Sequence, residues 1–300
     1  MISKEKDPSG YFERLLTKGM GTLPPPELPD EKWMAAHMPP APADSNKGFY
    51  GKAVVYAGSA LYPGAALLAA KACLAGGGGI LTVFSREEVR PYFTNLPEAI
   101  FRAALPEGLL AASRTALSAA HAVCLGPGWG EGAYGEILAA AMRSDCGTVL
   151  DADALNYMAK HPEAMALLSA NCVLTPHPGE MSRLLGCSIG SVLADPAGTA
   201  RSFAGEHRCT VLLKGTCTII TDGTRMAITA EGNCGLAKGG SGDVLSGLIT
   251  AMLCRGKSPF EAACLGSLLL GVGAKRAFAA LRERMLRATD ITEVIKSDML

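Results

Sequence analysis

Net charge is what this 300-residue chain lacks, because its 28 Lys and Arg residues balance its 28 Asp and Glu residues. A neutral chain argues against a nucleic-acid-binding protein, whose usual mark is a clustered basic surface. An apolar fraction of 49% is too high for a disordered chain. A chain of this length buries about three quarters of its unfolded surface, so its core needs no disulfide or metal ion to hold it together.

Paired cysteines are also missing, since the ten cysteines include no C-x-x-C motif. Most lie in apolar runs such as HAVCL and AMLC, which indicates small buried residues in a reducing compartment rather than zinc ligands. The sequence has no long apolar run free of charge, as a membrane span would require. Its charged N-terminus lacks the apolar core of a signal peptide. We therefore expect a cytoplasmic protein that does not bind a membrane.

From Gly51 onward, short apolar runs alternate with longer stretches rich in alanine and leucine. Continuous apolarity predicts strands that are covered on both faces, as in a mostly parallel sheet, so the fold class is a three-layer α/β domain. The predicted strands are 52–57, 80–84, 121–125, 147–151, 172–175 and 209–214, and the helices between them include 65–75, 135–142 and 178–185. CTIIT and MAIT, joined through Asp222-Gly223, predict a small antiparallel hairpin at one edge. Two long helices, about 242–255 and 260–283, close the chain.

Prolines are concentrated near the N-terminus, between Pro24 and Pro42. This spacing predicts an extended arm, preceded by a short helix around residues 11–16. Length alone allows two domains. The proline-rich arm, and the strand–helix pattern that follows it, instead favour an N-terminal extension over residues 1–45 and one domain over residues 46–300.

Glycine is the one residue in clear excess, at 35 residues against an average of about 7%. The strongest glycine signal is the segment GNCGLAKGGSGD, which runs directly into the apolar stretch VLSGLITAMLC. Free amides at a helix amino terminus bind anions, and Lys238 adds a positive charge. Asp243 in the first turn could accept a hydroxyl proton, so the segment fits phosphoryl transfer. The alternative is a helix cap whose glycines only permit close packing. The segment is not a P-loop, because G-x-x-x-x-G-K-[ST] does not occur.

Ligands of open α/β sheets bind beyond the carboxyl ends of the strands, so residues there are further candidates. His177 lies between two prolines after a predicted strand, which favours a ligand contact over a core position. The segment 214–218 could hold a nucleotide or simply form a turn. Asp151 and Asp153 could contact Mg²⁺ through water, or Asp153 could cap a helix. The G-x-G-x-x-G match at 130–135 starts too far beyond its strand for a dinucleotide-binding turn.

Several segments together resemble the NAD(P)H-hydrate dehydratases of the ribokinase-like superfamily, over about residues 46–280. They are KGFYGKAVVYAGSALYPGAALLAAKACLAGGGG, GPGWG, LDADALN, LTPHPGE, LLKGTCTII and GNCGLAKGGSGDVLSGL, in the family's order. The resemblance implies a single α/β domain assembled as a homotetramer. It also implies a cofactor-repair activity, the ADP- or ATP-driven dehydration of the S epimers of NADHX and NADPHX.

The resemblance also implies roles for individual residues. Asp243 would be the catalytic carboxylate that contacts the hydrated nicotinamide. The residues that would line the hydrated cofactor with it are Ala65, Gly128 and His177. The residues that would hold the adenine nucleotide and its phosphates are Lys214, Gly215, Thr216, Cys217, Thr218, Gly239, Gly240, Ser241 and Gly242. Mg²⁺ would offset charge on the phosphates, and the sequence does not identify ligands for it.

The chain departs from the family pattern in three places, where Asn46, Trp129 and Ser241 stand for a common histidine, leucine and threonine. The 45 residues ahead of the domain are too few to supply the epimerase domain often fused there, so we expect a separate epimerase partner. The alternative function is a small-molecule (vitamin-precursor) kinase of the same superfamily. A non-catalytic nucleotide-binding protein is the third possibility.

Overall fold

The computed structural model describes residues 25–46, 48–103, 108–130, 134–231, 236–281 and 286–298. The helix predicted around residues 11–16 and the first glycines of GNCGLAKGGSGD lie outside these ranges. The described strands form one nine-stranded sheet in the order β3-β2-β1-β4-β5-β6-β7-β8-β9. All neighbours are parallel except β7–β8 and β8–β9, which are antiparallel. The predicted mostly parallel sheet with an edge hairpin is therefore confirmed.

The strands agree with the predicted runs to within one or two residues at each end. They are β1 Lys52–Tyr56, β2 Ile80–Ser85, β3 Ala99–Ala103, β4 Ala122–Leu125, β5 Gly147–Leu150, β6 Cys172–Leu174, β7 Thr210–Leu213, β8 Thr218–Thr221 and β9 Met226–Thr229. Strand β3 is the exception, because no predicted run corresponds to it. It is the edge strand next to β2 and none of its residues is fully buried, so it lacks the continuous apolar run that marks the inner strands.

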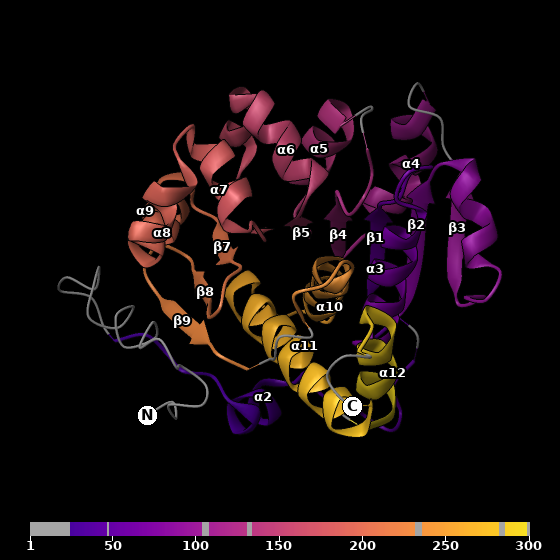
Figure 1. Cartoon of the computed structure of the whole chain (residues 1–300). Coiled ribbons are helices and arrows are strands. Elements are labelled where there is room, and N and C mark those ends of the chain that lie inside the picture. Colours follow the sequence, from indigo (N-terminus) through magenta and orange to yellow (C-terminus); the bar gives the residue numbers. More distant parts are fainter. Residues whose placement is uncertain are drawn as a thin grey trace.

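Helices cover both faces of the sheet, as Figure 1 shows. One layer consists of α2 Glu31–His37, α3 Pro63–Ala75, α10 Ser241–Cys254, α11 Pro259–Leu281 and α12 Ala288–Asp298. The other consists of α4 Leu109–Ser118, α5 Tyr134–Met142, α6 Asp153–Lys160, α7 Pro178–Leu185, α8 Ile189–Ala194 and α9 Pro196–His207. Short 3-10 segments, η1 Glu87–Phe93 and η3 Pro162–Leu167, join some of these elements. Side chains that alternate along each strand divide between two cores; Val55 joins the first, while Val54 and Tyr56 join the second.

Helix α10 lies directly against α3 beneath the sheet. The contact is close because α10 carries Gly247, where an added Cβ would overlap the carbonyl oxygen of Ala69. Small residues on both helices therefore allow the two backbones to approach. This packing brings the amino terminus of α10 to the same side of the sheet as the carboxyl ends of the parallel strands.

The proline-rich segment is not extended throughout. Asp30 caps helix α2 by accepting a hydrogen bond from the Trp33 amide at 2.8 Å. No proline interrupts Glu31–His37, so the expectation of an extended arm is wrong there. Glu27 exchanges backbone hydrogen bonds with β9 and so covers the edge of the sheet. The boundary between an extension and a domain near residue 45 stays a prediction.

One helix among the described residues, Pro259–Ala280, is long and apolar enough to cross a membrane. Within the fold, 78% of its apolar window is buried, as expected for the core helix of a globular protein. The described cysteines are free thiols, and all of them except Cys187 are buried. Their predicted role as small core residues is confirmed, apart from Cys187, while Cys234 lies outside the described ranges.

Candidate active site

Two glycine loops meet at the carboxyl edge of the sheet, after β4 and at the start of α3. Gly128 has a φ of +56°, and an added Cβ would lie only 2.6 Å from the Ala65 Cβ and 2.8 Å from the Tyr62 Cβ. The structure therefore brings together two of the predicted substrate-lining residues, Ala65 and Gly128. Trp129, from the same loop, turns inward and packs against Tyr56 with a ring separation of 5.5 Å. Its side chain fills the core rather than the site.

The segment after β5 makes a sharp turn at Ala152, whose φ of 46° is unusual for a residue with a side chain. Asp153 follows inside the first turn of α6 and accepts a hydrogen bond from the Gly130 amide at 2.8 Å. Its suggested role as helix cap is wrong, since Ala152 occupies the N-cap position. Instead, Asp153 holds the loop after β4 against α6.

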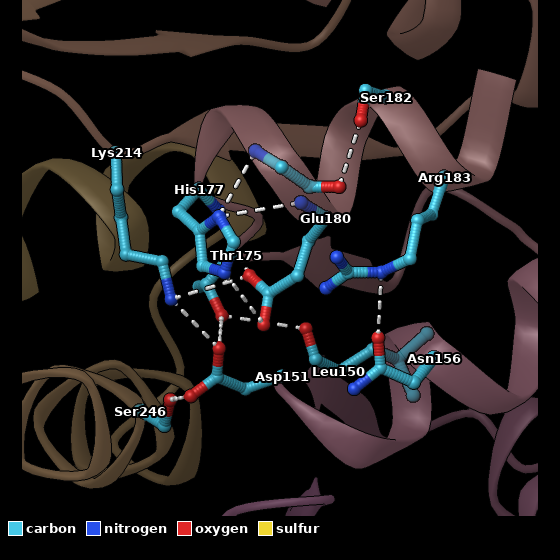
Figure 2. Close-up of polar contacts among 11 residues, drawn as sticks. Leu150, Asp151, Asn156, Thr175, His177, Glu180, Ser182, Arg183, Lys214 and Ser246 are labelled. Atoms are coloured by element: carbon cyan, nitrogen blue, oxygen red, sulfur yellow. Dashed lines mark hydrogen bonds and ion pairs between the residues drawn. The ribbon is translucent and has the colours of Figure 1, made fainter. Parts of the chain in front are cut away.

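Asp151 lies at the centre of a buried polar network, shown in Figure 2. Its carboxylate is 2% exposed. Oδ1 accepts hydrogen bonds from Thr175 Oγ1 at 2.8 Å and from Lys214 Nζ at 3.0 Å. Oδ2 accepts a hydrogen bond from Ser246 Oγ at 2.7 Å. A buried carboxylate requires such partners, and these come from the ends of β6 and β7 and from α10.

Lys214 directs its ammonium group toward the amino terminus of α10. A Cβ placed on Gly242 would lie 3.7 Å from Lys214 Nζ and 3.8 Å from Asp151 Oδ2. Burial alone would lower the pKa of Lys214, but the carboxylates of Asp151 and Glu180 outweigh it and raise that pKa. Lys238 instead donates a hydrogen bond to the carbonyl oxygen of Leu286 at 3.0 Å. Of these two lysines, Lys214 rather than Lys238 therefore places its positive charge at the start of α10.

Asp243 lies in the first turn of α10, after the N-cap residue Gly240. Gly240 has a φ of +94°, which favours glycine, and Ser241 is buried at 8% exposure. Burial and the negative charge of Asp151 raise the pKa of Asp243 to about 7, against the opposing charge of Lys214. A carboxylate with a pKa in this range can accept a proton near neutral pH.

His177 is the N-cap residue of α7. Its Nδ1 accepts hydrogen bonds from the amides of Gly179 at 3.0 Å and Glu180 at 3.3 Å, while Glu180 Oε2 accepts one from the His177 amide at 2.8 Å. Burial lowers the pKa of His177, and the nearby cation Lys214 lowers it further against the charge of Glu180. Figure 2 shows His177 beside Lys214. The imidazole ring of His177 is half exposed.

The residues predicted to hold the nucleotide, 214–218, differ in how exposed they are. Gly215 and Thr216 are exposed just after β7, and Thr218 begins β8. Cys217 is 3% exposed and its side chain belongs to the core, so only its backbone could contact a nucleotide. Gly239 is exposed at the other end of the predicted site, ahead of α10.

Three residues of the network had no assigned role in the sequence: Thr175, Glu180 and Ser246. Thr175 and Glu180 lie in the LTPHPGE segment. Because this segment follows a predicted strand, its polar residues could have been named as candidates for the site. Ser246 is four residues beyond Gly242 and donates to its carbonyl oxygen at 3.0 Å. Helical spacing of four could therefore have placed Ser246 on the face of the site.

No group of three His, Cys, Asp or Glu residues within the described ranges could hold a metal ion. Asp151 in particular already accepts hydrogen bonds from three protein donors. The arrangement that the protein itself provides is a helix amino terminus, an ammonium group and a carboxylate with a raised pKa.

The layers, strand order and position of this site define a ribokinase-like fold. A ribokinase-like superfamily protein of Enterococcus faecalis superposes with a TM-score of 0.79 at 23% identity, covering 90% of this chain and 94% of that one. A family model described as NAD(P)H-hydrate dehydratase matches residues 53–297. The chain belongs to the NAD(P)H-hydrate dehydratase family.

Individual relatives agree with that assignment. The chain is 38% identical to an ADP-dependent (S)-NAD(P)H-hydrate dehydratase of Neisseria meningitidis, over 77% of this chain and 78% of that protein. It is also 38% identical to a bifunctional NAD(P)H-hydrate repair enzyme of Leishmania major over 82% of this chain, but it spans only 49% of that relative's length. The ADP/ATP-dependent dehydratase of Bacillus subtilis, co-crystallised with ATP/Mg²⁺, superposes with a TM-score of 0.77 at 29% identity, covering 90% of this chain and 96% of that one.

Proposed function

We propose that this chain catalyses the ADP- or ATP-dependent dehydration of (S)-NADHX and (S)-NADPHX, which returns them to NADH and NADPH. The observation that carries the proposal is the position of Asp243, with a pKa of about 7, at the glycine-rich start of α10. Lys214 faces the same helix turn. Family membership supports the choice of substrate.

The chemistry begins with transfer of a phosphoryl group to the hydroxyl of the hydrated ring. The bond between phosphorus and the nucleotide oxygen breaks, a bond to the ring oxygen forms, and Asp243 accepts the hydroxyl proton. Amides at the start of α10 and the Lys214 ammonium stabilise negative charge on the phosphoryl group. The lone pair of the ring nitrogen then forms a C=N bond and breaks the C–O bond of the neighbouring carbon, which releases phosphate. Loss of a proton from the next ring carbon restores the dihydropyridine.

Mg²⁺ is proposed to arrive with the nucleotide. The described residues include no cluster of three His, Cys, Asp or Glu residues that could hold a metal ion, so the phosphate oxygens would be its principal ligands. Its contribution would be to offset charge on those phosphates. The Bacillus subtilis dehydratase supports this, since that protein was co-crystallised with ATP/Mg²⁺.

The test is to give the purified protein NADHX, Mg²⁺ and either ADP or ATP. Absorbance of the dihydronicotinamide ring should return together with one phosphate for each molecule repaired. Failure of both nucleotides to restore that absorbance would contradict the proposal. Comparing the two nucleotides in parallel determines which donor the protein prefers.

The same experiment distinguishes the two alternative functions. A small-molecule kinase would produce a stable phosphorylated product rather than free phosphate. A non-catalytic binding protein would bind the nucleotide without consuming it. Product analysis by mass spectrometry, with a calorimetric measurement of nucleotide binding, separates these outcomes.

Assembly, partner and location complete the proposal. We propose a homotetramer, which light scattering tests directly. We also propose that an epimerase supplies the S epimer from the R epimer, which a coupled assay with R-NADHX tests. A cytoplasmic location is in keeping with the buried free thiols, and fractionation of cells tests it.

A further inference from the structure

The Asp151 carboxylate takes no part in the proposed chemical steps, but it accepts three hydrogen bonds from side chains. It is 2% exposed, and each of its oxygens accepts at least one hydrogen bond. Thr175 donates at 2.8 Å and Ser246 at 2.7 Å. These two hydroxyls belong to different elements, so together they fix the direction of the carboxylate.

The carboxylate fixed in this way determines where Lys214 lies. Lys214 Nζ is 3.0 Å from Asp151 Oδ1 and 3.8 Å from Glu180 Oε2. The ammonium group faces the first turn of α10, which itself carries about half a positive charge. Two positive groups would repel each other at this position, and Asp151 supplies the negative charge that keeps them together.

The backbone next to Asp151 is strained. Ala152 has φ 46° and ψ −110°, outside the regions that L-residues populate freely. Such a conformation costs about 1–3 kcal/mol and persists only where the surroundings require it. Here the turn allows Asp151 to face Ser246 while Asp153 faces Gly130.

We propose that Asp151 is a positioning residue that holds the Lys214 ammonium against the first turn of α10, where Lys214 contacts the phosphoryl group during transfer. Asp151 itself makes and breaks no bond. This inference rests on the proposed function, because it assigns a role within the phosphoryl-transfer step. The group that would contact the phosphoryl group is the ammonium of Lys214, not the backbone amides of residues 214–218.

The pKa of Asp243 provides a readout of where the Lys214 ammonium lies, provided that the charge at position 151 is kept. Beyond burial, the charges of Asp151 and Asp153 raise its pKa, and that of Lys214 lowers it. Glu180, at the start of α7, and Asp243 also raise the pKa of Lys214. The charge of Lys214 in turn lowers the pKa of His177. Removing the charge of Asp151 should therefore lower the pKa of Asp243, and removing that of Lys214 should raise it.

The experiment compares Asp151→Asn, Asp151→Glu and Lys214→Met with the wild-type protein in the NADHX assay across pH. Asp151→Asn should lower kcat by about 10²-fold, the usual loss on misplacing a catalytic group, with a small change in KM for NADHX. The acid limb of the kcat profile should move to lower pH in Asp151→Asn and to higher pH in Lys214→Met. Asp151→Glu keeps the charge but displaces the ammonium, so kcat should fall and the acid limb should move to higher pH, as in Lys214→Met.

Asp145→Asn is the matched control, because Asp145 is exposed just before the opposite end of β5. It should retain the wild-type kcat and pH profile. Wild-type kcat in Asp151→Asn, or an acid limb that stays in place in Asp151→Glu, would overturn the inference while leaving the proposed function intact. A wild-type protein without dehydratase activity would overturn the proposed function itself. If Asp151→Asn does not fold, Lys214→Met decides alone: unchanged kcat would refute the role of the ammonium group.

Discussion

The Ala65 methyl group lies so close to the α-carbon of Gly128 that a Cβ on residue 128 would sit 2.6 Å from it. The two residues come from the start of α3 and from the loop after β4, which adjacent parallel strands bring together. Under the proposed function, both would line the hydrated cofactor. The absence of a side chain at position 128 is a steric requirement of the packing between this loop and the start of α3.

Gly128→Ala should destabilise the fold and impair the site. The φ of +56° disfavours alanine, and its methyl group would contact Ala65 and Tyr62 too closely. We expect the free energy of unfolding to fall by about 2–3 kcal/mol, as for other strained substitutions. Urea unfolding measures this change. Gly64→Ala is the control, since no atom lies within 4 Å of an added Cβ there, and it should leave stability unchanged or slightly raised.

Asp243→Asn should reduce turnover by at least ~10²-fold, because the amide cannot accept the hydroxyl proton. Nucleotide affinity measured by calorimetry should be retained. In the wild-type protein, kcat should increase with pH through about 7, as the Asp243 carboxyl with its raised pKa loses its proton. Undiminished turnover in Asp243→Asn would contradict the role of this residue as a base.

The same carboxyl should make stability depend on pH. Its pKa is raised from 3.8 to about 7 in the folded protein, so between these values the folded state binds more protons than the unfolded state. The contribution of Asp243 to the free energy of unfolding should therefore decrease as pH rises across this interval. At higher pH, Asp243→Asn should be more stable than the wild type by up to about 4 kcal/mol, at about 1.4 kcal/mol per pKa unit. Below the interval the difference should disappear, and a difference that is independent of pH would refute the assignment.

Ala152→Gly should relieve the strained turn after β5. Glycine adopts a positive φ without steric cost, so we expect the free energy of unfolding to rise by about 1 kcal/mol. Thermal unfolding followed by circular dichroism measures the change. Ala159→Gly, in the same helix α6 but with ordinary helical geometry, should instead lower stability by about 1 kcal/mol. Equal losses in both variants would show that Ala152 is not strained.

The amino-acid sequence was sufficient to predict the layered fold. Continuous apolar runs between glycine-rich loops predict buried parallel strands, and β1, β2 and β4–β7 are found at those runs. The sequence did not predict the two elements whose local pattern is weak, β3 and α2. Strand β3 is only partly buried, and α2 is a short helix between prolines whose packing on α11 the local sequence does not reveal.

For the site, the sequence by itself determined the glycine-rich start of α10 and the presence of Asp243 in its first turn. Only the tertiary structure decided which other groups lie beside it. Sequence proximity favoured Lys238 as the cation, whereas the fold directs Lys238 to Leu286 and brings Lys214 to α10. Asp151 meets Lys214 and Ser246 across separations of 63 and 95 residues. Strand order and helix packing determine such contacts, because side chains become neighbours only when the sheet assembles.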